Sequence, residues 1–491
     1  MVETVEVAAL PLAPRNPLPY LQQMKAGRSF HTGCEALRDA GGPVTRCSLA
    51  PTWMLPPLVV TTSPKGARDV LSRSYPFVDR ESPAFNEQRR LNGGSLFNFK
   101  YEAWLPRRRV LQPVFTKQHV MQFAGHMAES ADKLSQAWGE DVVVDLDQEC
   151  RRLTLRVLAR SVLGLDIDGR ADPLGEPLRA MQKYVRDRGV RPVRAPWWLP
   201  TPARRRARAA NDTFQRLADD ILQGCRADPT RDAPLVRALI DVADPETGQP
   251  LSDDDIRHEL VVFLAAGHNT TATTLTYALW ALGAHPELQD RVAAEVAAVG
   301  DRPLTSNDVP GLGYTVQVLH EALRLCPPAA GTTRMVMKDF DVDGYRVEAG
   351  TLVLVGIYAM HRDPSLWDHP LVFDPDRFSP ANSKDRDRWQ FLPFGGGPRS
   401  CIGDHFAMLE ATSVWRPSSD TRKLNRSTTT FRSPCRSRWS PPPRSGPGPA
   451  RGTDLRETTL TRCVGPDNYA SRYGPDRHRV RGAYLHGPVD G

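Results

Sequence analysis

The sequence lacks most of the features that mark secreted or membrane-inserted chains. Its eight cysteines are scattered over 491 residues without a C-x-x-C pair. This spacing disfavours a disulfide framework and favours reduced thiols in a reducing compartment. No uninterrupted apolar run reaches the roughly 18 residues of a transmembrane helix. Glu3 and Glu6 stand where a signal peptide needs positive charge. We therefore expect a cytoplasmic protein without a transmembrane segment.

Positive charge is in excess, but only at one end of the chain. The formal net charge is +7, which alone would favour a nucleic acid or a membrane surface as partner. Residues 416–491 hold 14 arginines and one lysine against six acidic residues, leaving 49 basic and 51 acidic residues in the first 415. The main body is therefore nearly neutral. Binding to nucleic acid would depend on the tail alone, and we expect no nucleic-acid partner.

Helical patterns dominate the main body, and strand patterns are few. Prolines 11, 14, 17 and 19 predict an extended amino-terminal strap over residues 1–30. A good N-cap at Ser252 opens a long apolar helix that runs to Gly283. Strand-like segments follow near the carboxyl end, at Phe340–Val342, Tyr345–Val347 and Thr351–Ile357. We expect a mainly α fold with small β-sheets.

The last section has a different composition. A helical pattern that begins at Phe406 breaks near Ser413 into Arg/Ser/Pro-rich sequence without an apolar period. We predict that residues 413–491 are a disordered tail. Because the change interrupts a helix, a shifted reading frame is one hypothesis, and a genuine basic appendage is the alternative.

The strongest motif is FGGGPRSCIG, from Phe394 to Gly403. It places Cys401 in a glycine-rich loop just before a predicted helix. Backbone N–H groups of such a loop, together with a helix amino terminus, would stabilise negative charge on a thiolate. The alternative interpretation is a buried cysteine at a turn, which does not account for the composition of the whole segment.

This loop resembles the haem-binding loop of the cytochrome P450 family, whose pattern is Phe-x-x-Gly-x-Arg-x-Cys-x-Gly. The resemblance implies that Cys401 is the axial thiolate ligand of the haem iron. It also implies that Arg399 pairs with a haem propionate and that Phe394 and Gly403 belong to the cofactor-binding loop. The implied cofactor is haem b, iron protoporphyrin IX.

Two further motifs occur in the order that the family has them. Glu321 and Arg324 form an E-x-x-R pair, and residues three apart share a helix face. Arg377, in FDPDRF, matches the third partner of this pair. The resemblance implies a buried structural network of these three residues.

Other residues match positions at which the family holds the haem propionates. Trp104 and Arg108 fit W-x-x-x-R, and Arg334 follows the double proline at 327–328. The resemblance implies that all three bind the cofactor.

The segment AGHNTT, Ala266 to Thr271, lies inside the long predicted helix. It resembles the oxygen-activating segment of the family, which implies that Thr270 hydrogen-bonds bound dioxygen and helps to deliver protons. Asn269 stands at the position of the usual acid. Asparagine does not ionise but still orients water. We take Thr270 and Asn269 as the catalytic pair. His268 could titrate near neutral pH, but the preferred interpretation is that it is the variable residue of the motif.

Two basic segments have open interpretations. Residues 195–211 join an apolar, aromatic tip to a basic helix and resemble the loop over the substrate entrance. This segment could touch a membrane surface or admit lipophilic substrates, or it could be a lid packed on the body with a solvated arginine face. Arg107, Arg109 and Lys117 could steer an acidic electron donor, or they could be an ordinary charged face.

The resemblance implies a single-domain P450 fold over residues 31–412, around a buried haem. The implied activity inserts one oxygen atom of O2 into a lipophilic substrate, with electrons from a separate ferredoxin and ferredoxin reductase. Two alternatives remain: a haem-thiolate enzyme of another reaction type, and a non-functional haem binder or pseudogene product caused by the altered carboxyl end.

Overall fold

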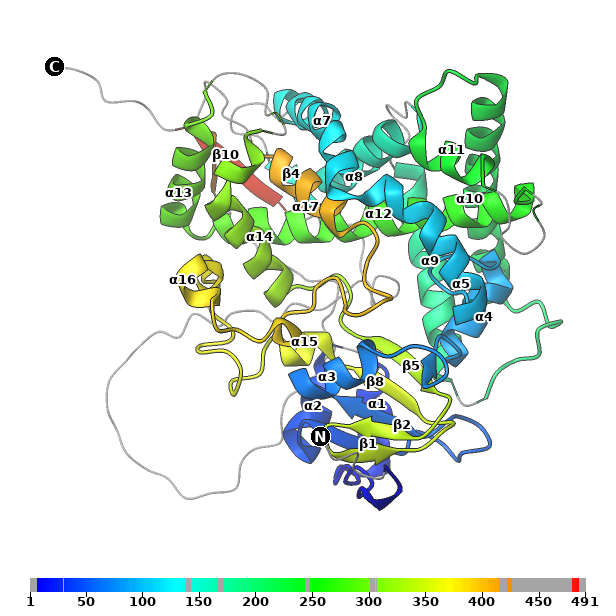
Figure 1. The fold of residues 1–491 in the computed structure, drawn as a ribbon. Coiled ribbons are helices and arrows are strands. Elements are labelled where there is room, and N and C mark those ends of the chain that lie inside the picture. Colours follow the sequence, from blue (N-terminus) through cyan, green and yellow to red (C-terminus); the bar gives the residue numbers. More distant parts are fainter. Residues whose placement is uncertain are drawn as a thin grey trace, which may run out of the picture.

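The computed structural model describes residues 7–415, apart from residues 30, 138–142, 166–171, 192, 243–247, 249, 301–304 and 306. It also describes 422–425 and 479–484 in the tail. Figure 1 shows a large helical part and, at one side, a sheet accompanied by the first helices of the chain. The predicted mainly α fold with small β-sheets is confirmed.

The elements follow one another along the chain as follows. The α-helices are α1 Tyr20–Ala26, α2 Thr32–Gly41, α3 Pro64–Leu71, α4 Pro83–Asn92, α5 Tyr101–Leu111, α6 Lys117–Val120, α7 Ala124–Ala137, α8 Leu146–Val162, α9 Asp172–Val190, α10 Pro202–Ala227, α11 Pro234–Ile240, α12 Asp253–Leu282, α13 Pro286–Ala297, α14 Gly313–Leu325, α15 Ile357–Met360, α16 Pro380–Ser383 and α17 Asp404–Ser413. Short 3-10 helices are η1 Val7–Ala9, η2 Gln112–Phe115, η3 Met121–Phe123, η4 Val309–Gly311, η5 Pro375–Phe378 and η6 Arg388–Gln390.

Helix α12 crosses the helical part and organises its core (Figure 1). It begins as the sequence predicts, because the Ser252 hydroxyl accepts the Asp255 N–H at 3.1 Å and three aspartates fill its first turn. It ends at Leu282 with Gly283 as the C-cap. Helices α8, α10, α14 and α17 pack against it. No helix among the described residues has the length and apolar character needed to cross a membrane.

The main sheet has five strands in the order β1-β2-β8-β5-β3. Strands β2 and β8 are parallel, and the other neighbours are antiparallel. The strands are β1 Val44–Cys47, β2 Leu58–Thr61, β3 Val78–Asp79, β5 Thr332–Val336 and β8 Leu352–Val355. The sheet therefore joins segments from both ends of the body.

A separate hairpin pairs β6 Phe340–Val342 with β7 Tyr345–Val347. Its two-residue turn, Asp343-Gly344, has positive φ at both positions, 54° and 86°. Such a turn matches the twist of the strands and favours an Asp-Gly sequence. The predicted strands at 340–342 and 345–347 are confirmed, and the third predicted segment contains β8.

The amino-terminal strap is extended only in part. Leu12 and Arg15 form isolated bridges with Arg346 and Arg46. From Tyr20 the chain turns into α1, with Pro19 as the N-cap at φ −55°. A helix therefore lies inside the range 1–30 that the prolines predict as extended. The reason is that proline excludes a helix interior but suits a helix entry.

Two segments of the tail are strands. Strand β10, Arg479–Tyr484, pairs antiparallel with β9, Arg422–Asn425, and with β4, Val143–Asp145. Helix α17 ends at Ser413, which is where the sequence changes composition. The remainder of the predicted disordered tail lies outside the described residues.

Candidate active site

The cysteine loop is shaped by glycines at points of close approach. A Cβ on Gly397 would lie 1.8 Å from the carbonyl oxygen of Leu71, and φ at Gly397 is +70°. A Cβ on Gly396 would lie 2.5 Å from the ring of Trp389. The loop closes where the Cys401 N–H donates to the Phe394 carbonyl at 2.9 Å. It is therefore packed tightly against α3 and η6, and only glycine fits at these two positions.

Cys401 differs from the other described cysteines, because it is exposed and they are buried. Desolvation by the surrounding chain raises the pKa of its thiol. The Gly403 N–H lowers that pKa, the Asp404 carboxylate raises it, and the guanidinium groups of Arg108 and Arg80 lower it. The cysteine is thus accessible to a ligand while donors and positive charge that favour a thiolate lie close by.

The predicted propionate-binding residues meet in one cluster. Arg399 pairs with Asp79 at 3.0 Å, and its guanidinium lies 4.5 Å from the ring centroid of Trp104. Arg108 donates to the carbonyl of Ser400 at 3.2 Å.

Arg334 lies on β5. There it donates to the hydroxyl of Thr332 at 3.0 Å and to the carbonyl of Thr333 at 2.9 Å. Segments far apart in sequence, from α5, β5 and the cysteine loop, therefore bring four predicted residues together.

Sequence reasoning missed a fourth arginine of this cluster, Arg80, which directly follows β3. Desolvation lowers its pKa well below the ordinary value, and the charges of Arg334, Arg399 and Arg108 lower it further. Its Nε has no hydrogen-bond partner among the described residues. No motif marks this residue in the sequence.

The cluster carries more positive charge than its neighbours balance. Desolvation and the charge of Arg399 lower the pKa of Arg334 to about 10, and desolvation lowers the pKa of Arg399 to about 10. Asp79 is the carboxylate that counters them. Buried charge without a partner is costly. The four arginines therefore suit a ligand with two negative groups, and the two propionates of haem fit this requirement.

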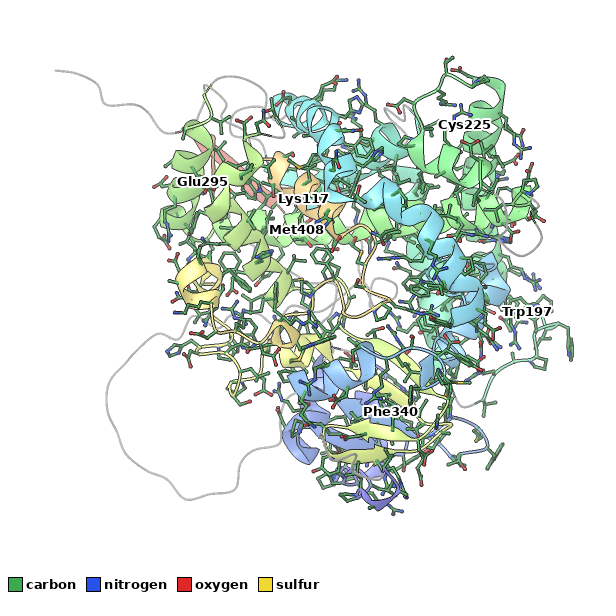
Figure 2. All side chains as sticks on the ribbon, viewed as in Figure 1. Lys117, Trp197, Cys225, Glu295, Phe340 and Met408 are labelled. Carbon is green, nitrogen blue, oxygen red and sulfur yellow. The ribbon has the colours of Figure 1, made fainter. Side chains whose placement is uncertain are left out.

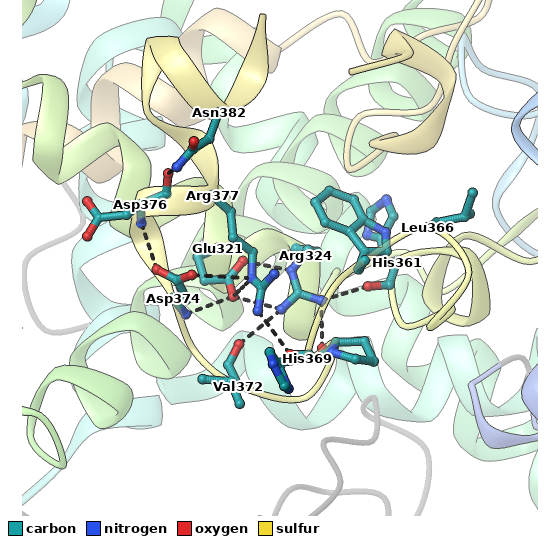
Figure 3. A network of polar contacts seen from close by, with 12 residues as sticks. Glu321, Arg324, His361, Leu366, His369, Val372, Asp374, Asp376, Arg377 and Asn382 are labelled. Atoms are coloured by element: carbon teal, nitrogen blue, oxygen red, sulfur yellow. Dashed lines mark hydrogen bonds and ion pairs between the residues drawn. The ribbon is translucent and has the colours of Figure 1, made fainter. Parts of the chain in front are cut away.

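Glu321, Arg324 and Arg377 form a second, separate network (Figure 3). Arg324 binds both carboxylate oxygens of Glu321 at 2.7 Å, and both side chains are fully buried. Arg377 Nε lies 3.5 Å from Glu321 Oε1. Burial raises the pKa of Glu321, whereas Arg324 acts in the opposite direction.

The remaining donors of Arg324 satisfy main-chain carbonyls. Nη1 donates to His361 at 2.8 Å and to Pro370 at 2.7 Å, and Nη2 donates to Val372 at 3.2 Å. The network therefore fastens the segment 361–377 to α14. The structural role that the family resemblance implies for these three residues stays a prediction.

The catalytic candidates lie near the middle of α12. Thr270 is exposed, and its hydroxyl donates to the Ala266 carbonyl at 2.8 Å. The amide oxygen of Asn269 accepts a hydrogen bond from Arg151, and Arg151 also pairs with Asp147 at 2.9 Å. Because its oxygen is engaged, the side chain of Asn269 presents its NH2 group as a donor.

His268 is not a titrating group at neutral pH. It is buried, and desolvation together with the charge of Arg151 lowers its pKa to about 4. This burial answers the question that the sequence left open, since a neutral imidazole supplies no proton near pH 7.

Glu410, on α17, is a second buried group that sequence reasoning missed. It is 1% exposed, and burial raises its pKa well above the ordinary value, against a hydrogen bond with Thr271. It links α17 to α12 one residue beyond Thr270. A usable signal is present in the sequence, because a single acid stands within the apolar pattern around Leu409 and Ala411.

The three basic residues considered for an electron donor separate into two groups. Arg107 turns inward and pairs with the buried Glu259 at 3.1 Å, with only 11% of its side chain exposed. Arg109 and Lys117 are exposed, and Figure 2 marks the position of Lys117. Arg107 is therefore not available as a surface charge.

The fold and the cysteine loop together define a haem-thiolate protein. The chain belongs to the cytochrome P450 family, whose family model matches residues 11–414. Haem iron is the cofactor that this membership implies.

Curated relatives agree with this assignment. The chain is 32% identical to cyclooctat-9-en-7-ol 5-monooxygenase of Streptomyces melanosporofaciens over 72% of this chain and 76% of the relative. It is 32% identical to cyclooctatin synthase of the same organism over 83% and 87%. It is 30% identical to pentalenene oxygenase of Streptomyces avermitilis over 79% and 87%. The protein is accordingly a P450 oxidoreductase of the monooxygenase class.

Proposed function

We propose that this monooxygenase inserts one oxygen atom of O2 into a lipophilic small molecule and that its cofactor is haem b. The observation that carries the proposal is the placement of an accessible Cys401 beside four arginines, three of which share the carboxylate of Asp79. Cys401 would ligate the iron, and Arg80, Arg108, Arg334 and Arg399 would hold the propionates. The cofactor would supply oxygen activation when bound.

The names of the relatives support a proposal for the substrate class. Two relatives act on cyclooctat-9-en-7-ol and pentalenene, which by name are an unsaturated alcohol and an alkene. We propose a lipophilic substrate of the same kind. Thr270 and Asn269 would act as hydrogen-bond groups on α12, with the Asn269 amide held by Arg151.

We further propose that electrons come from a separate ferredoxin and its reductase. The exposed Arg109 and Lys117 support this by offering positive charge to an acidic donor. Cytoplasmic location stays a prediction from the cysteine pattern.

The absorption spectrum of the reduced, CO-bound protein tests the cofactor site. A thiolate-type Soret band is expected from wild type and should be lost in Cys401→Ser. Monooxygenation is then tested with 18O2, ferredoxin, reductase and candidate alkenes, where one labelled oxygen atom should enter the product. Unlabelled oxygenated product that forms only with added peroxide would favour another haem-thiolate reaction, which the amide at position 269 keeps open.

The carboxyl end bears on whether the protein is active. The family match ends at residue 414, next to the end of α17 and the start of the Arg/Pro-rich sequence. This coincidence supports the alternative proposal of a shifted reading frame, under which the chain would be a non-functional haem binder or pseudogene product. Translation of the coding DNA in the other two frames beyond Ala411 tests it, since an apolar, strand-bearing continuation should emerge. A chain that takes up no haem would refute the enzymatic proposal.

A further inference from the structure

Three aromatic side chains follow one another from the arginine cluster to the surface. The guanidinium carbon of Arg399 lies 4.5 Å from the ring centroid of Trp104. The ring centroids of Trp104 and Tyr101 are 5.9 Å apart, and those of Tyr101 and Tyr75 are 6.2 Å apart. Both separations are those of aromatic pairs in contact. Trp104 is 4% exposed and Tyr75 is 50% exposed. Trp104, Tyr101 and Tyr75, which we call the aromatic series, therefore lead from the proposed haem site to solvent.

The fold holds the aromatic series in place. Tyr101 and Trp104 lie three residues apart on α5 and so share a helix face. The Tyr101 N–H donates to Asp79 Oδ2 at 3.0 Å, while Asp79 Oδ1 accepts from Arg399 at 3.0 Å. Tyr75 comes from the loop between α3 and β3, and its ring is inclined by only 17° to that of Tyr101. One carboxylate thus fixes the start of α5 relative to the arginine that covers Trp104.

Packing explains why these rings touch, but it does not explain which residues they are. Phenylalanine would fill the same volume, whereas tyrosine and tryptophan are the aromatic residues that give up one electron most readily. Tyr277 and Trp280 on α12 form a comparable pair, 5.5 Å apart, in which both members are buried. The aromatic series differs from that pair because it has one end at the arginine cluster and the other in solvent.

Electrostatics favours movement of an electron vacancy outward along the series. Loss of an electron leaves a positive charge on the indole of Trp104, and the guanidinium of Arg399 beside it disfavours that charge. At the exposed end, the phenol of Tyr75 can release its proton to water and become a neutral radical. The vacancy is therefore more stable at the surface than beside the cluster.

The accessible thiol of Cys401 gives such a pathway a use. An exposed thiolate beside an oxidant passes to sulfenic acid and then, irreversibly in most proteins, to sulfinic acid. An oxidant that is not consumed by substrate would attack this side chain. A pathway that supplies electrons from elsewhere in the protein removes the oxidant before it does so.

We propose that the aromatic series conducts oxidising equivalents from the haem site to the surface when no substrate is oxidised, and that it thereby spares Cys401. The proposal rests on the proposed function, since it needs haem at that site. Trp104 gives one electron to the oxidant, Tyr101 restores Trp104, and Tyr75 restores Tyr101 and releases its phenol proton to water. A small thiol then returns an electron and a proton to Tyr75, and two such thiols form a disulfide.

The electrons balance when the oxidant is hydrogen peroxide. One peroxide takes up two electrons and two protons and yields two water molecules. Two passages along the aromatic series supply the two electrons, and the two protons that Tyr75 releases to water equal the two that the peroxide takes up. The substrate-free reaction of the ferric protein with peroxide is therefore a direct probe of the pathway.

Radical trapping in the full-length ferric holoenzyme tests the proposal. Hydrogen peroxide is added without substrate, together with a nitroxide that couples to tyrosyl radicals, and peptide mass spectrometry locates the adduct. Wild type should carry the adduct on Tyr75. The adduct should be lost in Tyr101→Phe, which keeps the ring but not the phenol. Tyr20 is the matched control, because it is 46% exposed on α1, outside the series. It should carry no adduct, and Tyr20→Phe should leave the Tyr75 adduct unchanged.

Equal labelling of Tyr20 and Tyr75, or an adduct on Tyr75 that persists in Tyr101→Phe, would overturn the pathway. Oxidation of Cys401, followed by mass spectrometry, should be faster in Tyr101→Phe and in Tyr75→Phe than in wild type or Tyr20→Phe. Equal rates in all four proteins would overturn the protective role.

The two proposals fail in different ways. A holoenzyme that incorporates 18O from O2 into product but forms no adduct on Tyr75 refutes the pathway alone. A holoenzyme that forms the adduct but incorporates no 18O supports the pathway and contradicts monooxygenation. A protein without a thiolate-type Soret band contradicts the proposed function and, with it, the pathway.

Discussion

Arg107 Nη1 lies 3.1 Å from Glu259 Oε1, and this contact ties α5 to α12 beneath the surface. The same carboxylate accepts the N–H of Leu96 through both oxygens, at 2.9 Å and 3.0 Å. The carboxylate of Glu259 thus binds both α5 and the loop that precedes α5. Burial raises the pKa of Glu259 to about 7, against the lowering effect of Arg107.

Glu259 should make stability fall as pH rises. Its pKa is raised on folding, so its contribution is complete below the ordinary value of 4.5 and is lost as pH increases to about 7. The loss is at most about 3 kcal/mol. Urea unfolding between pH 5 and 8 should show a decline in wild type that is shallower in Glu259→Gln. Parallel profiles for the two proteins would contradict the assignment.

His361 should lower the stability of the folded protein at acidic pH. Burial and the charges of Arg324 and Arg362 lower its pKa to about 3. The unfolded chain takes up a proton below pH 6.5 while the folded chain does not, so stability is lost as pH falls from 6.5 toward 3. The His361 Nε2 accepts the Leu392 N–H at 2.9 Å. His361→Gln keeps a hydrogen-bond acceptor, and its free energy of unfolding should fall less steeply as the pH decreases. Urea unfolding between pH 4 and 7 measures this.

Arg80 should affect haem retention more than folding. Arg80→Met removes one of the three arginines that share Asp79, so the apoprotein should keep its stability within about 1 kcal/mol, because repulsion within the cluster decreases. Haem transfer to apomyoglobin should be about tenfold faster, as expected for a lost charge-assisted contact. Arg109→Met, from the exposed part of α5, is the control. A wild-type transfer rate in Arg80→Met would exclude it from the propionate site.

Replacing Glu410 by glutamine should leave the stability nearly unchanged, whereas replacing it by alanine should lower the stability. Burial raises the pKa of Glu410 well above its ordinary value and so favours the neutral carboxyl, and Glu410→Gln keeps a neutral group that can contact Thr271. Its unfolding free energy should change by less than about 1 kcal/mol, whereas Glu410→Ala should lose about 2 kcal/mol or more from the cavity and the unpaired hydroxyl. Equal losses in both variants would contradict a neutral, hydrogen-bonded carboxyl at this position.

Asn269 should limit the supply of protons. Asn269→Asp places an ionisable acid beside Arg151, which already binds the oxygen of the amide. Product formed per NADPH consumed should increase, and its pH profile should gain a new ionisation. Asn269→Ala should instead lower this ratio. If Asn269→Asp left both the ratio and the pH profile unchanged, position 269 would have no part in proton transfer.

Local patterns made much of the fold predictable. Ser252 and the acids after it define the start of α12, and Asp343-Gly344 defines the hairpin, because each depends on residues within a few positions. The spacing of Glu321 and Arg324 places them on one helix face, and the family resemblance implied that they pair.

Arg80 and Arg107 could not be placed in this way. Strand β3 pairs with β5 so that Asp79 lies opposite Met335, and this pairing carries Arg80 to Arg334. In the sequence, nothing separates Arg107 from the other arginines near it. It turns inward because Glu259, on α12, lies within ion-pair distance of α5 in the folded protein. Both depend on contacts between distant segments, which charge patterns along the chain do not encode.

The contact between Arg399 and the Phe99 carbonyl, 2.8 Å long, joins residues 300 positions apart. Arg108 and Ser400 are joined across 292 positions. Contacts of such separation form slowly, because the intervening chain must first be ordered. During synthesis the arginine cluster cannot assemble until the cysteine loop has left the ribosome, long after α5 has folded. We therefore expect cofactor insertion only after the cysteine loop has emerged, and a nascent chain stalled before residue 394 should have no capacity to retain haem.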